Sequence, residues 1–170
     1  LGDPKEHATI IGPLITERAL ETVKRRVEDA VSGGAKVLAG GEAVGACFQA
    51  TLLADVPPDS DLARLETFGP VASIEAVDSG EQAVERANDT SYGLAAGILT
   101  SDPERGMALA EKLQSGIVHV NDQPVHDEPQ MPFGGVKDSG WGRFGGTFAM
   151  DEFTELRWIT VQSGTRPFPF

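Results

Sequence analysis

The spacing of apolar side chains divides the first part of the chain into one helix and two extended runs. Apolar residues recur at helical intervals between Thr16 and Gly33, with charged residues between them, which predicts an amphipathic helix. Thr16 is a suitable N-cap, and the Gly33-Gly34 pair would end the helix. Extended runs follow at 35–41 and 47–56, and a pair of prolines closes the second.

The middle of the chain repeats this alternation. The run 93–100 is apolar on both faces, as in a buried strand, and Asp102 with Pro103 would begin a helix. Strands and helices that alternate with short connections are typical of βαβ units. We therefore predict an α/β fold, a mainly parallel sheet with flanking helices. The remaining expected elements are strands at 70–77 and 116–121 and helices at 80–90 and 102–115.

The periodicity is lost after Asn121, where glycines and prolines dominate. A long loop within a compact domain is usually functional or disordered, and its aromatic residues argue against disorder here. A short helical stretch is expected at 146–155. Alternating side chains predict a strand at 155–162, and the tail 163–170 reads as irregular.

Composition excludes several classes of protein. A net charge of −12 argues against a nucleic-acid partner or an anionic membrane surface. No apolar run is long enough to span a membrane, and the first residues do not resemble a signal peptide. The single cysteine, Cys47, precludes an intramolecular disulfide and is compatible with a cytoplasmic location. The 170 residues begin without Met, so we expect a part of a longer polypeptide.

One stretch, "ETFGPV" at Glu66–Val71, combines an acid and an aromatic ring with a Gly-Pro pair that forces a bend. The residues alone allow either an ordinary turn with a solvated Glu66 or a rigid corner that holds a ligand. The three histidines show no metal-ligand spacing, so no metal site is predicted.

Several stretches in order, including "ETFGPV", "SGIVHVN", "PFGGVKDSGWGRFGG" and "FTELRWITVQ", resemble the NAD(P)-dependent aldehyde dehydrogenase superfamily. The resemblance implies that 1–150 is the C-terminal part of the catalytic domain and that 151–170 is an oligomerisation strand with its tail. It also implies oxidation of an aldehyde to a carboxylic acid through a cysteine thiohemiacetal.

The resemblance assigns a role to the corner. Glu66 would accept hydrogen bonds from the nicotinamide ribose hydroxyls, and Phe68 would pack near the nicotinamide of NAD or NADP. Cys47 falls on a segment that the family uses as a structural strand. No catalytic residue is therefore expected in this chain, and activity would require the upstream part of the same enzyme.

The stretch "HVNDQPVHDEPQMPFGG" narrows the resemblance to the benzaldehyde, salicylaldehyde and vanillin dehydrogenases. Val125, His126 and Phe133 are then the expected pocket residues for an aromatic aldehyde. His126 or Gln123 would meet a ring hydroxyl; the alternative for His126 is an exposed loop residue that contacts nothing. His119 is expected to be a structural histidine with its hydrogen bonds satisfied.

The same resemblance makes 155–162 an intersubunit strand, which implies a homo-oligomer, a dimer or a tetramer. Phe144 replaces a Glu that many relatives use in proton relay, so any relay must run elsewhere. Two other functions remain open: a truncated, non-catalytic paralogue that acts as an interaction module, and a semialdehyde or acyl-CoA-forming dehydrogenase of the same superfamily.

Overall fold

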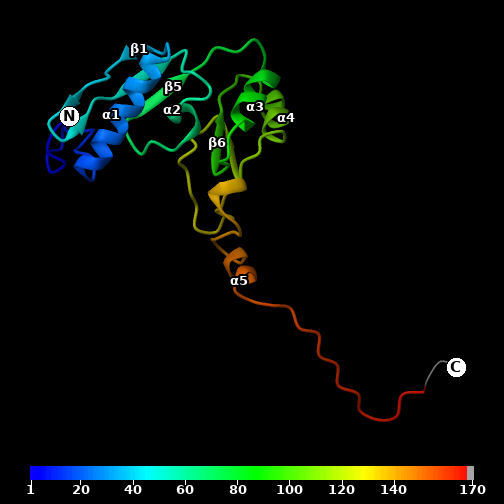
Figure 1. Ribbon diagram of the computed structural model, residues 1–170. Coiled ribbons are helices and arrows are strands. Elements are labelled where there is room, and N and C mark those ends of the chain that lie inside the picture. The colour runs from blue at the N-terminus through cyan, green and yellow to red at the C-terminus, as the bar shows by residue number, and fades with distance from the viewer. Residues whose placement is uncertain (168–170) are drawn as a thin grey trace. The chain divides into compact units, whose positions relative to one another are not determined.

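The computed structural model describes residues 1–167 and divides the chain into two compact units, Leu1–Ala83 and Val84–Phe170 (Figure 1). Each unit is described by itself. This division does not test the predicted boundary at residue 150, which remains a prediction. No helix in the described part of the chain has the length and apolar character needed to cross a membrane.

Helix α1 (Glu17–Ser32) organises the first unit, and it begins and ends where the sequence predicts. The Thr16 hydroxyl accepts a hydrogen bond from the backbone N–H of Ala19, which caps the N-terminus. At the other end, the N–H of Gly33 donates to the carbonyl of Asp29.

A three-stranded sheet lies against this helix. Its strand order is β1-β4-β5; β1 pairs antiparallel with β4, and β4 pairs parallel with β5. The predicted extended run 47–56 is broken after Phe48, so it forms two strands rather than one. The elements of this unit beyond α1 are β1 (Lys36–Ala39), β2 (Ala43–Val44), β3 (Cys47–Phe48), β4 (Thr51–Ala54), α2 (Asp61–Arg64) and β5 (Val71–Ile74).

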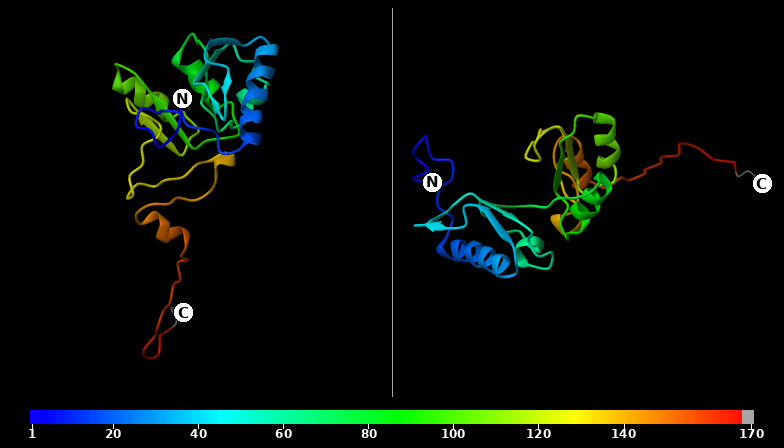
Figure 2. Two further views of the ribbon diagram at one scale, coloured as in Figure 1. Left: turned by 90° about the vertical axis from the view of Figure 1, so that its left-hand side faces the viewer. Right: turned by 90° about the horizontal axis from the view of Figure 1, so that it is seen from above.

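Helix α1 lies beside the strands of the first unit (Figure 2). Among the described residues, α1 supplies four of the seven core residues, and β3 and β4 supply one each. Val23, Phe48 and Leu53 are fully buried. Burying side chains of this size stabilises a fold by about 1.5–3 kcal/mol each. The other members of this core are Leu20, Val27, Ala30 and Ala35.

The second unit contains a parallel βαβ unit. Strands β6 (Ala95–Ile98) and β7 (Ile117–Val120) pair in parallel, and α4 (Pro103–Ala110) connects them. As predicted, the Asp102 carboxylate caps α4 by accepting from the N–H of Arg105. Strand β6 is only partly buried: Gly97 is exposed and its other three residues are intermediate. Helix α3 (Gly80–Asn88) precedes β6 and spans the boundary between the units.

The end of the chain departs from the sequence prediction. A 3₁₀ turn (Lys137–Ser139) and α5 (Phe148–Glu152) form, but the strand predicted at 155–162 does not. Trp158 is 91% exposed there. A strand needs a neighbour for its backbone hydrogen bonds, and no described segment of this chain offers one. The α/β class is confirmed; the sheets contain parallel pairs, β4-β5 and β6-β7, and antiparallel pairs, β1-β4 and β2-β3.

Candidate functional site

The Glu66–Val71 corner is held by its backbone while its acid and its ring face solvent. Arg26 on α1 donates from Nη1 to the main-chain carbonyl of Glu66 at 2.5 Å and approaches the Thr67 hydroxyl at 3.3 Å. The Glu66 side chain is exposed, and Phe68 is 83% exposed. The corner therefore presents a free carboxylate and a free aromatic face.

The second half of the corner is fixed against both α1 and β4. A Cβ on Gly69 would lie 2.6 Å from Cγ2 of Val23, so only glycine allows the chain to pass this close to the helix. The carbonyl of Pro70 accepts from the N–H of Thr51 at 2.8 Å. Phe68 has φ of 49°, a conformation that is costly for a residue with a Cβ. Strain of this kind recurs at ligand sites.

A cavity of about 580 Å³ lies within the second unit. Strand β7 and the loop that follows it form the walls. Of the predicted pocket residues, His126 and Phe133 line this cavity, whereas Val125 is 84% exposed and does not. The polar side chains in the lining are His119, Asp122, His126, Asp127 and Glu128.

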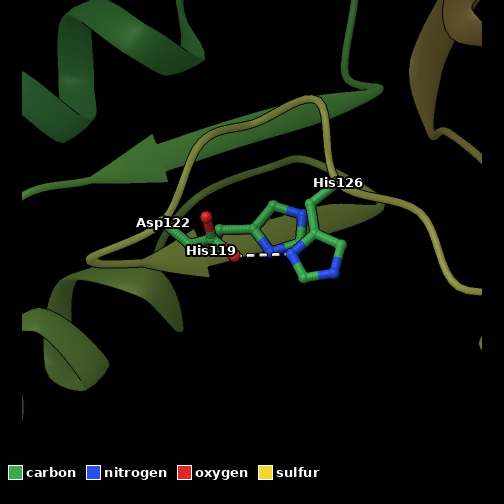
Figure 3. A group of neighbouring side chains, drawn as sticks. All are labelled: His119, Asp122 and His126. Atoms are coloured by element: carbon green, nitrogen blue, oxygen red, sulfur yellow. Dashed lines mark hydrogen bonds and ion pairs between the residues drawn. The ribbon is translucent and has the colours of Figure 1, made fainter.

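Three of these side chains form a His–Asp–His cluster: His119, Asp122 and His126 (Figure 3). Nδ1 of His126 lies 2.5 Å from Oδ2 of Asp122. The rings of His119 and His126 stack with their centroids 5.6 Å apart and their planes 6° from parallel. Nε2 of His126 lies 3.6 Å from Oε1 of Glu128.

The cluster stands at the carboxyl end of the parallel strand pair. His119 is on β7, and Asp122 and His126 belong to the loop that leaves it. Asn121, with φ of 62°, turns the chain at this point, and its side-chain oxygen accepts from the N–H of Thr100 just after β6. Ligands of open α/β sheets bind at this edge.

The electrostatics of the cluster follow from the bond between His126 and Asp122. The hydrogen bond to Asp122, and then its negative charge, raise the pKa of His126 above its ordinary value. The same bond lowers the pKa of Asp122, assisted by the N–H of Gln123. Both groups therefore favour their charged forms.

The prediction for His119 is wrong, and the structure also excludes the alternative given for His126. His119 is not satisfied, because its Nε2 is buried without a hydrogen-bond partner among the described residues. His126 is not a loop residue without contacts, since it touches His119, Asp122 and Glu128. Sequence spacing could not join them, because the chain changes from strand to loop between them. The order His-x2-Asp-x3-His, which runs from β7 into the loop after it, is recognisable as a cluster only once the structure is known.

Cys47 lies buried in β3 as a free thiol, beside the core residue Phe48. This position fits the predicted structural role, since a reactive cysteine needs access and a polar setting that lowers its pKa.

The fold agrees with what comparison with known proteins shows. The model of the aldehyde dehydrogenase family matches residues 1–159, and the chain belongs to this family. A vanillin dehydrogenase from Pseudomonas fluorescens is 44% identical over 168 residues, 99% of this chain and 35% of that protein. This chain thus spans about a third of the length of such relatives.

Solved structures agree. A salicylaldehyde dehydrogenase from Pseudomonas putida G7, complexed with salicylaldehyde, superposes with a TM-score of 0.93 at 38% identity, over 100% of this chain and 35% of that one. An aldehyde dehydrogenase from Mycobacterium tuberculosis, complexed with NAD+, gives 0.89 at 33% identity, over 98% of this chain and 35% of that one. The resemblance to the aromatic-aldehyde branch is confirmed.

Proposed function

We propose that this chain is the C-terminal part of an NAD(P)-dependent dehydrogenase that oxidises an aromatic aldehyde to its carboxylic acid. It supplies part of the coenzyme site and one wall of the substrate pocket. The attacking thiol would come from the upstream part of the same enzyme. The aldehyde carbon would gain one oxygen atom from water and lose a hydride. NAD(P)+, when bound, would accept that hydride.

The observation that carries this proposal is the Glu66–Val71 corner. Its backbone bonds to α1 and β4 fix the turn, while the Glu66 carboxylate and the Phe68 ring remain free. An ionised carboxylate can accept from two neighbouring hydroxyls, as on a ribose. A corner fixed before binding lowers the ordering cost of capturing such a ligand.

The cavity beside β7 supports the second part of the proposal. Phe133 gives it an aromatic wall, and its backbone exchanges two hydrogen bonds with Phe144, at 2.9 and 2.7 Å. His126 gives it a polar group that can meet a ring substituent. Val125, exposed in this chain, is proposed to contact the aldehyde once the upstream part completes the pocket.

The test is Glu66→Gln in the full-length enzyme. Loss of the charge should weaken NAD(P) positioning and slow turnover by about tenfold, with unchanged thermal stability. Glu42→Gln, which removes the same charge from another exposed position in the first unit, should leave turnover unchanged. Wild-type kinetics in Glu66→Gln would remove this residue from the coenzyme site. The chain alone should produce no NAD(P)H with any aldehyde.

We further propose that residues 155–162 form a strand only in an oligomer, a dimer or a tetramer. Their apolar side chains are exposed in the single chain. Exposed apolar strand segments favour pairing with another chain.

A further inference from the structure

We infer that the His–Asp–His cluster binds a divalent transition-metal cation. Its donors are two imidazole nitrogens and one carboxylate oxygen, a set that suits Zn²⁺, Co²⁺ or Ni²⁺ rather than Mg²⁺. The inference uses His126, which the proposed function places in the substrate pocket, but its test is Zn²⁺ binding by the chain and does not depend on dehydrogenase activity.

The geometry brings the three donors near one another but not yet to bonding positions. One ligand atom from each of the three residues lies within 4.8 Å of the others. Two atoms bonded to one tetrahedral Zn²⁺ at about 2.1 Å are about 3.4 Å apart. The widest pair must therefore approach by about 1 Å or somewhat more. Asp122 and His126 are on an exposed loop and can make this movement, whereas His119 is positioned by β7.

His119 gives the strongest reason to expect a ligand. Its Nε2 is buried and accepts or donates no hydrogen bond among the described residues. A buried polar atom without a partner costs about 1–3 kcal/mol. A cation bound by this nitrogen, in its neutral form, would remove that cost. The two rings lie stacked and nearly parallel (Figure 3), so at least one of them must turn for both nitrogens to face one ion.

The charge around the cluster favours a cation as well. Asp127 and Glu128 line the same cavity, so three carboxylates stand near two histidines. Metal binding would replace the hydrogen bond between His126 and Asp122. The proton between Nδ1 and Oδ2 would leave to solvent, and the metal would bind these two atoms instead. Three protein ligands would leave the ion a position for water.

A bound ion would cross-link two segments of the second unit. The ion would connect β7, through His119, to the loop that carries Asp122 and His126. That loop continues to Phe133 along the cavity wall. A bound cation should therefore stiffen the wall and raise the thermal stability of the second unit.

Calorimetric titration of the chain with ZnCl₂ tests the inference. We expect one ion per chain, reversal by EDTA, and no comparable binding of MgCl₂. His119→Ala, His126→Ala and Asp122→Asn should each weaken Zn²⁺ binding by at least about tenfold. The matched controls are Asp127→Asn, which removes the same charge from the same cavity and should weaken binding much less than Asp122→Asn, and His7→Ala, which should bind as the wild type does.

A second measurement needs no variant. In ¹H–¹⁵N spectra of the histidine rings, Zn²⁺ should shift the nitrogens of His119 and His126 and leave those of His7 unchanged. The inference is overturned if Zn²⁺ does not bind, if it shifts all three histidines alike, or if Asp127→Asn weakens binding as much as Asp122→Asn.

Discussion

Arg26 reaches from α1 to the main-chain carbonyl of Glu66, and this bond of 2.5 Å connects residues 40 positions apart in the sequence. Nε of the same guanidinium is buried and has no hydrogen-bond partner among residues 1–167. The arginine thus leaves one polar group unsatisfied and still holds the corner from which the proposed coenzyme ligands project. It acts on Glu66 only through the backbone, as a positioning residue.

Arg26→Ala should therefore loosen the corner. We expect a stability loss of about 1–3 kcal/mol in urea unfolding, because the Glu66 carbonyl loses a charged donor. In the full-length enzyme, the apparent affinity for NAD(P) should also fall. Arg25→Ala is the control: its ion pairs, both at 3.7 Å, are exposed and worth less than about 1 kcal/mol. Equal effects of the two substitutions would contradict the positioning role.

Gly69→Ala should destabilise the first unit by about 1–3 kcal/mol. The added Cβ would lie 2.6 Å from Cγ2 of the buried Val23, so helix and corner must separate. Denaturant unfolding measures the loss. Gly12→Ala is a suitable control, since its Cβ would meet the nearest atom of Pro4 at an ordinary 3.5 Å. Adding Val23→Ala to Gly69→Ala should recover part of the loss, and strictly additive effects would exclude the contact as the cause.

The bond between His126 and Asp122 predicts a pH dependence. In metal-free solution with EDTA, NMR titration should give His126 a pKa above the ordinary value of about 6.5. Asp122→Asn should return it toward that value, and Asp127→Asn should change it much less. A His126 pKa that is indifferent to Asp122→Asn would show that the bond does not persist in solution.

The sign of the stability effect follows from these shifts. A raised histidine pKa means that the His126 contribution is complete at low pH and is lost as pH rises through the folded-state pKa. A lowered aspartate pKa means that the Asp122 contribution is lost as pH falls through its folded-state pKa. The pair should therefore contribute most between about pH 4 and pH 6.5.

The elements of this fold could be predicted from the sequence where local chemistry decides them. Thr16 and Asp102 cap helices because their side chains satisfy free backbone N–H groups, a property of a few neighbouring residues. The break between β3 and β4 has no such local signal, since the run from Cys47 to Val56 is continuously extended in character.

The same distinction between local and long-range features applies to the two candidate sites. The residue types in "ETFGPV" already suggest that the corner can hold a ligand. The hydrogen bond from Arg26 that fixes this corner joins residues 40 positions apart, so the sequence does not predict it. His119 and His126 come together only because the chain turns at Asn121, so their separate positions in the sequence carry no sign of the cluster. The side chains of residues 155–162 alternate as in a strand. A strand also needs a second strand to pair with its backbone N–H and C=O groups, and the alternation does not predict where that second strand comes from.

Residues 155–162 lead to the last prediction, which concerns assembly. If they form a strand between copies of the full-length enzyme, Ile159→Pro should favour the monomer, because proline removes a ladder N–H and fits poorly within a sheet. Light scattering after gel filtration measures the mass. Ser163→Pro, just beyond the predicted strand, should keep the oligomer. The units should remain folded in both variants, since Ile159 is 71% exposed in the single chain. An oligomer that tolerates Ile159→Pro would place the subunit interface elsewhere.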